Sequence, residues 1–240
     1  MSSILAPLNL NTPLPDHNQL PSNDGVPVRN SLEPWQSSLL SETLEPVLRT
    51  RYPEGDYFIG QDCGIYWEKT DPPAQGCKAP DWYLIPNVPR LLDGQMRRSY
   101  VLWQELELPL VLLEYASDRG AEERDNTPMR GKFWVYDRKI HPAFYGIYLP
   151  DEARIEMYHA VEHHLELMPS NQAGRFPIRD LGVELGIWHG SYAGYEIPWM
   201  RWWDESGRLL PTREESEIRE KLENERLAAK LRALGVDPNV

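Results

Sequence analysis

The stretch Pro109-Leu-Val-Leu-Leu-Glu-Tyr-Ala116 is the strongest indication of the fold in this sequence. All four residues from Leu110 to Leu113 are apolar, which is typical of a strand buried on both faces of a sheet. Glu114 follows directly, and a carboxylate in such a strand is costly to bury unless it binds a metal ion or another partner. The stretch therefore predicts a buried central strand that carries a functional acidic residue near its end.

The elements around this strand are expected in the order α-β-β-β-α-β. Apolar residues at helical spacing from Pro34 predict a first helix that stops at Tyr52-Pro53. Two extended segments, Tyr57–Trp67 and Lys78–Ile85, are predicted to precede the central strand. After it, Thr127-Pro128 is typical of an N-cap followed by proline in the first helical turn, and it predicts a second helix that runs to Lys139.

The rest of the chain adds strands and a terminal helix to this α/β (α+β) core. Alternation with a period of two predicts a β-meander. Its strands are Phe144–Leu149, Arg154–Val161 and His163–Met168. A Trp-rich stretch follows, whose rings we expect in the core or at an interface rather than stacked on bases. From Pro211 the sequence is rich in Glu, Arg, Lys and Leu, and it predicts a charged helix that stops at Gly235.

A length of 240 residues favours one domain with tails over two domains. Residues 1–33 contain five prolines among Asn, Ser and Asp residues, which is typical of an extended or disordered arm. We therefore expect the domain in residues 34–210 and the charged C-terminal helix in residues 211–240.

The charge balance excludes one class of function. The 37 acidic and 25 basic residues give a net charge of −12, which excludes a protein that binds nucleic acids or membranes through general positive charge. An enzyme that contacts DNA locally, or through divalent cations, remains open. Two cysteines without CxxC spacing, no signal peptide and no apolar run of membrane-spanning length lead us to expect a cytoplasmic protein.

Three residues occur where metal-dependent hydrolysis of phosphodiesters would need them. Asp81 and Glu114 belong to neighbouring predicted strands, and Lys132 belongs to the helix that follows. Carboxylates at adjacent strand ends suit Mg²⁺ or Mn²⁺, because hard cations take oxygen ligands. The metal lowers the pKa of its bound water, and a nearby lysine orients that water or stabilises the transition state.

Three segments resemble the Uma2 family, a restriction-endonuclease family within the PD-(D/E)xK nuclease superfamily that is abundant in cyanobacteria. They are Pro80-Asp-Trp-Tyr-Leu-Ile85, Pro109–Ser117 and Gly131-Lys-Phe-Trp-Val-Tyr136. The resemblance runs from about Trp35 to the end of the chain. It implies a restriction-endonuclease-like core with a mixed central sheet flanked by helices, and a Mg²⁺- or Mn²⁺-dependent endonuclease that hydrolyses DNA.

The resemblance also implies roles for individual residues. Asp81 and Glu114 would be metal ligands, the main-chain carbonyl of Tyr115 a further ligand, and Lys132 the catalytic lysine. The lysine is expected from the helix, because Ala116 occupies the strand position of the usual E-x-K motif. By analogy with enzymes that cut both strands of a duplex, the resemblance suggests a homodimer.

The loop after the central strand departs from the family pattern and leaves other readings open. Residues 117–125 lack the usual Ser-x-x-Thr, and Pro128 replaces an Asp expected four residues before the lysine. The chain could thus be a catalytically inactive nuclease-fold binding or regulatory module, or an interaction protein that assembles through its Trp-rich region and terminal helix. A zinc site is disfavoured, since no further ligand has fitting spacing to the histidines at 159, 163 and 164.

Overall fold

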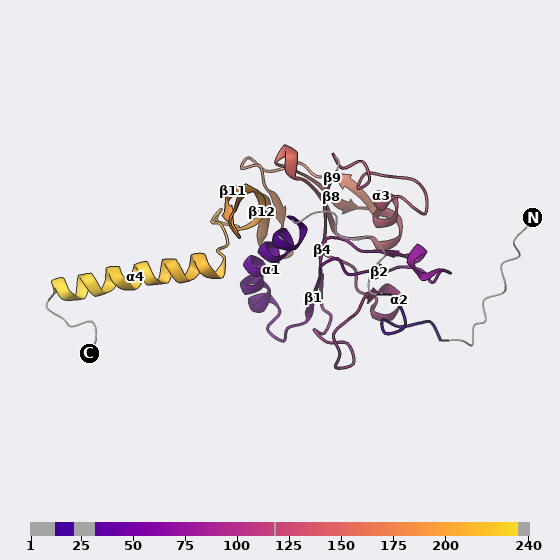
Figure 1. The fold of residues 1–240 in the computed structure, drawn as a ribbon, viewed down its shortest axis with the longest axis horizontal. Helices are drawn as coiled ribbons and strands as arrows, with labels where there is room; N and C mark the ends of the chain where they lie inside the picture. Colours follow the sequence, from indigo (N-terminus) through magenta and orange to yellow (C-terminus); the bar gives the residue numbers. More distant parts are fainter. Residues whose placement is uncertain (1–12, 22–31, 118, 235–240) are drawn as a thin grey trace, which may run out of the picture.

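The computed structural model describes residues 13–21, 32–117 and 119–234. Within them, a six-stranded mixed sheet in the order β1-β4-β6-β7-β8-β9 forms the centre (Figure 1). β6 and β7 are parallel, and the other neighbouring strands are antiparallel. The strands are β1 (Tyr57–Gly60), β4 (Trp82–Pro86), β6 (Val111–Tyr115), β7 (Phe144–Leu149), β8 (Arg154–Val161) and β9 (His164–Leu167).

The main sheet confirms the expected α-β-β-β-α-β order and the predicted meander. Helix α1 (Leu32–Arg51) comes first, and the parallel β6–β7 pair is joined through α3 (Lys132–Val135) and the π-helical segment η2 (Tyr136–Ile140). A helical crossover is the usual connection between parallel strands. The chain is therefore a mixed α+β protein, in agreement with a restriction-endonuclease-like fold.

Two smaller sheets correct the expected early strands. One has the order β3-β2-β5 and the other β10-β11-β12. The segment predicted as one strand at Tyr57–Trp67 turns at Asp62, which has a φ of 46°, and Lys78–Ile85 breaks at Pro80, which has no N–H for a ladder. Each prediction thus spans two sheets. The remaining elements are β2 (Ile65–Tyr66), η1 (Pro73–Gly76), β3 (Cys77–Lys78), β5 (Tyr100–Val101), α2 (Leu102–Glu105), η3 (Pro150–Glu152), β10 (Phe176–Ile178), β11 (Val183–Tyr192), β12 (Tyr195–Asp204) and α4 (Arg213–Ala233).

Both faces of the main sheet are covered, so all of β6 is buried, as predicted. Leu113 and Tyr115 pack in the cluster formed with α1 and the β10–β12 sheet, whereas Leu112 packs with α3 and η2. Figure 1 shows α1 with β11 and β12 on one side of the sheet and α2, α3 and β2 on the other. Because side chains alternate along a strand, Glu114 points with Leu112 towards α3.

The second helix begins later than predicted. Its first residue is Lys132 and its N-cap is Gly131. Thr127, the expected N-cap, instead donates both its N–H (2.8 Å) and its hydroxyl (2.6 Å) to Asp125 Oδ1. Such a local bond favours a turn over a helix, so residues 127–131 form the approach to α3 rather than its first turn.

The Trp-rich stretch packs in the core, as expected. Trp199 and Trp202 on β12 are buried, and the Trp202 indole N–H donates to the Leu40 carbonyl oxygen on α1 (3.1 Å). These two rings are therefore not available to stack on bases.

The terminal segments behave differently from each other. Residues 13–21 of the expected arm pack against the folded domain, which buries His17 and Leu20. The other arm residues before 32 lie outside the described residues. Helix α4 starts with a capping box between Thr212 and Glu215, has no buried residue and projects from the body (Figure 1). Its predicted stop at Gly235 lies outside the described residues. No described helix is both long and apolar enough to cross a bilayer.

Candidate active site

Asp81 and Glu114 face each other across two adjacent strands. In the antiparallel register of β4 and β6, Trp82 pairs with Leu113, and one step further sets Asp81 opposite Glu114. Asp81 Oδ2 accepts the main-chain N–H of Tyr115 at 2.5 Å. The two predicted acidic residues therefore lie where two neighbouring inner strands of the main sheet end, and this end of the sheet is called its edge below.

Lys132 completes the predicted trio. As the first residue of α3, it donates from Nζ to Glu114 Oε2 at 2.7 Å. Tyr136, four residues later on the same helical face, donates its hydroxyl to Glu114 Oε1. Glu114 is only 1% exposed, and both of its carboxylate oxygens have donors from this one crossover.

The pKa values of two residues at the site, Asp81 and Lys132, are both raised above their ordinary values. Burial raises the pKa of Asp81 well above its ordinary value, and the charge of Glu114 raises it further. For Lys132, burial alone lowers the pKa, but Glu114, Asp81 and Glu123 together hold the pKa of the ammonium above its ordinary value. The site thus keeps its lysine charged, whereas burial and then the charge of Glu114 disfavour the charged form of Asp81.

Helix α1 supports the same edge from the other face of the sheet. The Ser37 hydroxyl donates to the Asp81 carbonyl oxygen (3.2 Å) and lies 3.0 Å from the Tyr115 hydroxyl. A cleft of about 190 Å³ opens beside Asp81, and it is lined by Glu33, Pro34, Ser37, Gln61, Asp62 and Asp81. Asp81 therefore lines an open cleft.

The loop after β6 brings two further acidic residues to the lysine. Lys132 Nζ lies 3.7 Å from Glu123 Oε1 and 3.8 Å from Glu122 Oε1. Glu122 and Glu123 were not among the residues expected at the site from the sequence, and neither were Ser37 and Tyr136. The sequence carries a signal for Tyr136 alone, since its spacing of four from Lys132 on a predicted helix places both on one face.

The family model of Uma2, described as "Putative restriction endonuclease", matches residues 25–193. This is more than two thirds of the chain. The chain belongs to the Uma2 family. No curated protein is significantly similar to it. The Uma2 match contains Asp81, Glu114 and Lys132 and ends before α4, and it supports a nuclease function in general.

Asp81 and Glu114 provide two carboxylates rather than a complete set of ligands for a cation. Among the described residues, no group of three or more His, Cys, Asp or Glu side chains is arranged to hold a metal ion. In the meander, His164 contacts Asp137 (3.5 Å) and Arg138 (3.2 Å). A cation at Asp81 and Glu114 would need further oxygen donors, such as a main-chain carbonyl, water or phosphate.

Proposed function

We propose that the chain is a divalent-cation-dependent endonuclease that hydrolyses DNA phosphodiester bonds at Asp81, Glu114 and Lys132. The observation that carries the proposal is the convergence of two carboxylates on adjacent strands with a lysine 2.7 Å from one of them. Membership of the Uma2 family supports the same class of reaction.

The residues at this edge fit Mg²⁺ or Mn²⁺. Asp81 and Glu114 are hard oxygen donors. Burial, and then the charge of Glu114, raise the pKa of Asp81, and a bound cation would offset both effects. These two carboxylates would hold the cation, with the Tyr115 carbonyl as a further ligand. A bound cation supplies a water of lowered pKa and charge stabilisation for the phosphate.

The protein's own groups have distinct tasks in this proposal. Tyr136 and Lys132 fix the two oxygens of Glu114, and the Tyr115 N–H fixes Asp81. The Lys132 ammonium would donate to a phosphate oxygen and stabilise the negative charge that grows in the transition state.

The acidic surroundings explain why the reaction would require a cation. Glu33, Asp62 and Asp81 line the cleft, and the whole chain carries a charge of −12. A negatively charged phosphate that enters this cleft is repelled by the carboxylates that line it, and this repulsion disfavours binding. DNA binding at the site should therefore rise with added Mg²⁺ or Mn²⁺.

The proposal is tested by cation binding and DNA cleavage measured on the same variants. Titration calorimetry with Mn²⁺ should show binding to the wild type and to Lys132→Met, and no binding to Asp81→Asn. Cleavage of plasmid DNA should be lost in Asp81→Asn, Glu114→Gln and Lys132→Met, with Glu217→Gln on the exposed α4 as the active control. Cleavage retained in all three site variants, each folded by circular dichroism, would refute the proposal.

The departures in residues 117–125 favour one second candidate, a nuclease-fold binding module without catalysis. This loop places Glu122 and Glu123 beside the lysine, which adds negative charge where a phosphate would approach. A wild type that binds DNA in the presence of Mn²⁺ but does not cleave it with any divalent cation tested would support the binding module over the enzyme.

A further inference from the structure

Glu123 is a buried carboxylate beside the lysine of the proposed site. Its side chain is 5% exposed, and Oε1 lies 3.7 Å from Lys132 Nζ. Glu122 lies at a similar distance, 3.8 Å, but is 43% exposed. Water screens the exposed pair far more than the buried one, so Glu123 acts on the ammonium more strongly than its neighbour in sequence.

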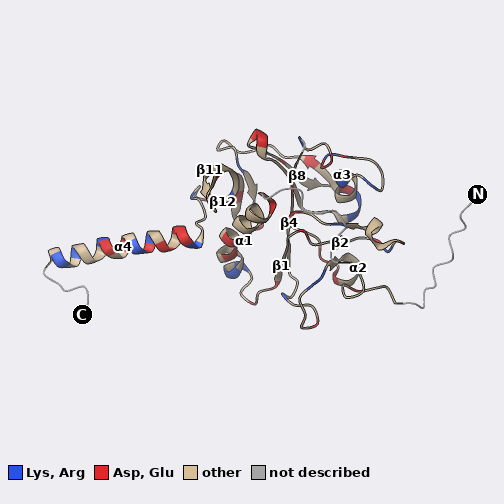
Figure 2. Cartoon of the chain, viewed as in Figure 1, with Lys and Arg blue, Asp and Glu red and all other residues tan. Residues whose placement is uncertain are grey.

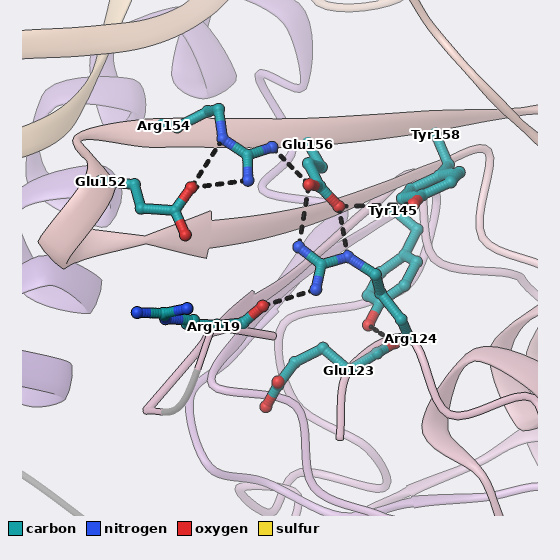
Figure 3. Close-up of polar contacts among 8 residues, drawn as sticks. All are labelled: Arg119, Glu123, Arg124, Tyr145, Glu152, Arg154, Glu156 and Tyr158. Carbon is teal, nitrogen blue, oxygen red and sulfur yellow. Dashed lines mark hydrogen bonds and ion pairs between the residues drawn. The ribbon is translucent and has the colours of Figure 1, made fainter. Parts of the chain in front are cut away.

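The main chain at Glu123 and the side chain of the next residue, Arg124, are both hydrogen-bonded to strands of the main sheet. The Tyr145 hydroxyl on β7 donates to the Glu123 carbonyl oxygen at 2.9 Å. The next residue, Arg124, donates from Nε (2.6 Å) and Nη2 (2.8 Å) to the two carboxylate oxygens of Glu156 on β8, and Figure 3 shows this two-pronged contact. Planar Arg–carboxylate pairs of this kind fix geometry as well as charge.

Two more contacts stiffen this anchor. Arg124 also donates from Nη1 to the Arg119 carbonyl oxygen at 2.5 Å, which closes the loop on itself. Arg154 reaches both Glu152 and Glu156, so that Glu156 lies between two arginines (Figure 3). The position of Glu123 is therefore set by the main sheet.

A buried carboxylate near two others is costly for the fold. Burial raises the pKa of Glu123, the charge of Lys132 lowers it, and the charges of Glu114 and Glu122 raise it. A rigid anchor that holds such a group next to a lysine indicates a role for the pair.

We infer that Glu123 is a positioning residue that holds the Lys132 ammonium over the site when Glu114 engages a cation. The inference rests on the proposed function for its catalytic meaning. In the structure, Glu114 Oε2 is the nearest carboxylate oxygen to Nζ, at 2.7 Å. A cation bound by Glu114 would weaken this pair, and the fixed carboxylate of Glu123, 3.7 Å from Nζ, would then hold the ammonium in place.

The holding role is testable without a cation or a substrate, because Glu114→Gln removes the same charge. Acylation of Lys132 by an amine-reactive reagent, followed by peptide mass spectrometry, reports how tightly the ammonium is held. We expect Glu123→Gln to raise the acylation rate several-fold more in the Glu114→Gln background than in the wild type, as a double-mutant cycle. Glu122→Gln should have a smaller effect in both backgrounds.

Cleavage kinetics separate this role from a merely structural one. Glu123→Gln should lower kcat with little change in KM, and Glu123→Asp, which keeps the charge, should restore part of the loss. An effect of Glu123→Gln that is equal in both backgrounds, or absent, would overturn the inference. A positive cycle in a protein that neither binds Mn²⁺ nor cuts DNA would sink the proposed function and leave the contact between Glu123 and Lys132 standing.

Discussion

Asp81 accepts the main-chain N–H of Tyr115, the residue directly after Glu114, through Oδ2 at 2.5 Å. The bond attaches the first acidic side chain of the site to the backbone of the strand that carries the second. Their separation is thereby set by the strand pairing rather than by flexible side chains. Like charges are held close together, and this has consequences for stability.

Asp81→Asn should stabilise the protein at neutral pH when divalent cations are removed with EDTA. A carboxyl whose pKa is raised in the folded state binds its proton more tightly there, so stability falls as pH rises from about 4 through the folded-state pKa. The asparagine variant avoids this loss. Urea unfolding between pH 3 and pH 8 should show a gain for the variant that vanishes below about pH 4; a wild type that is the more stable protein at pH 7 would contradict this. Asp180→Asn, in an exposed turn, controls for the loss of one charge.

Lys132→Met should destabilise the protein by about 3 kcal/mol, because it leaves the carboxylate of Glu114 buried without the lysine ammonium that pairs with it. Adding Glu114→Gln should recover part of that loss, since no unpaired charge then remains at this point. Urea unfolding of Lys132→Met, Glu114→Gln and the double variant measures each loss of stability, with Lys221→Met on α4 as the exposed control. A double variant that loses as much as the two single variants combined would show that the pair does not act as a unit.

Gly131→Ala should destabilise the approach to α3. A Cβ at this position would lie 2.1 Å from the Asp125 carbonyl oxygen, so the backbone itself must shift. We expect a cost of about 1–3 kcal/mol, as for other overpacking substitutions, together with displaced Lys132. Thermal unfolding tests it against Gly94→Ala, which has a positive φ but open space around it. A Gly131→Ala variant as stable as the wild type would mean that the close approach to Asp125 has no effect.

Arg124→Gln should loosen the loop that carries Glu123 while leaving global stability nearly unchanged. Its bonds to Glu156 join the loop to β8, and a partly exposed ion pair contributes about 1 kcal/mol. Amide hydrogen exchange in residues 119–126 should therefore accelerate about fivefold, since 1.4 kcal/mol corresponds to tenfold. Arg154→Gln, whose side chain is 46% exposed, should accelerate it less. Unchanged exchange in Arg124→Gln would show that the contact with Glu156 does not hold the loop in place.

The main sheet was accessible from the sequence because its signals are local. Four consecutive apolar residues before Glu114 mark a strand covered on both faces, and alternation marks the meander strands that follow. The element order then suffices to bring Asp81, Glu114 and Lys132 to one edge. Whether these residues bind a cation and cut DNA stays a prediction.

The remaining features depend on contacts that sequence patterns do not encode. The break at Asp62 interrupts a run that looks like one strand, and the late start of α3 depends on how Asp125 captures Thr127. Glu123 reaches Lys132 because Arg124 finds a partner 32 residues away. The pairing of Arg124 with Glu156 forms only when β8 is already in place beside the loop.

Helix α4 gives the molecule an uneven mass distribution. Its first turn is fixed where Arg201 contacts Glu215 (2.7 Å), and it continues with none of its side chains buried. At 1.5 Å per residue, its 21 residues extend about 30 Å from that point. Acidic and basic side chains both occur along it (Figure 2). Rotational diffusion should consequently be anisotropic and slower than for a sphere of 27.9 kDa.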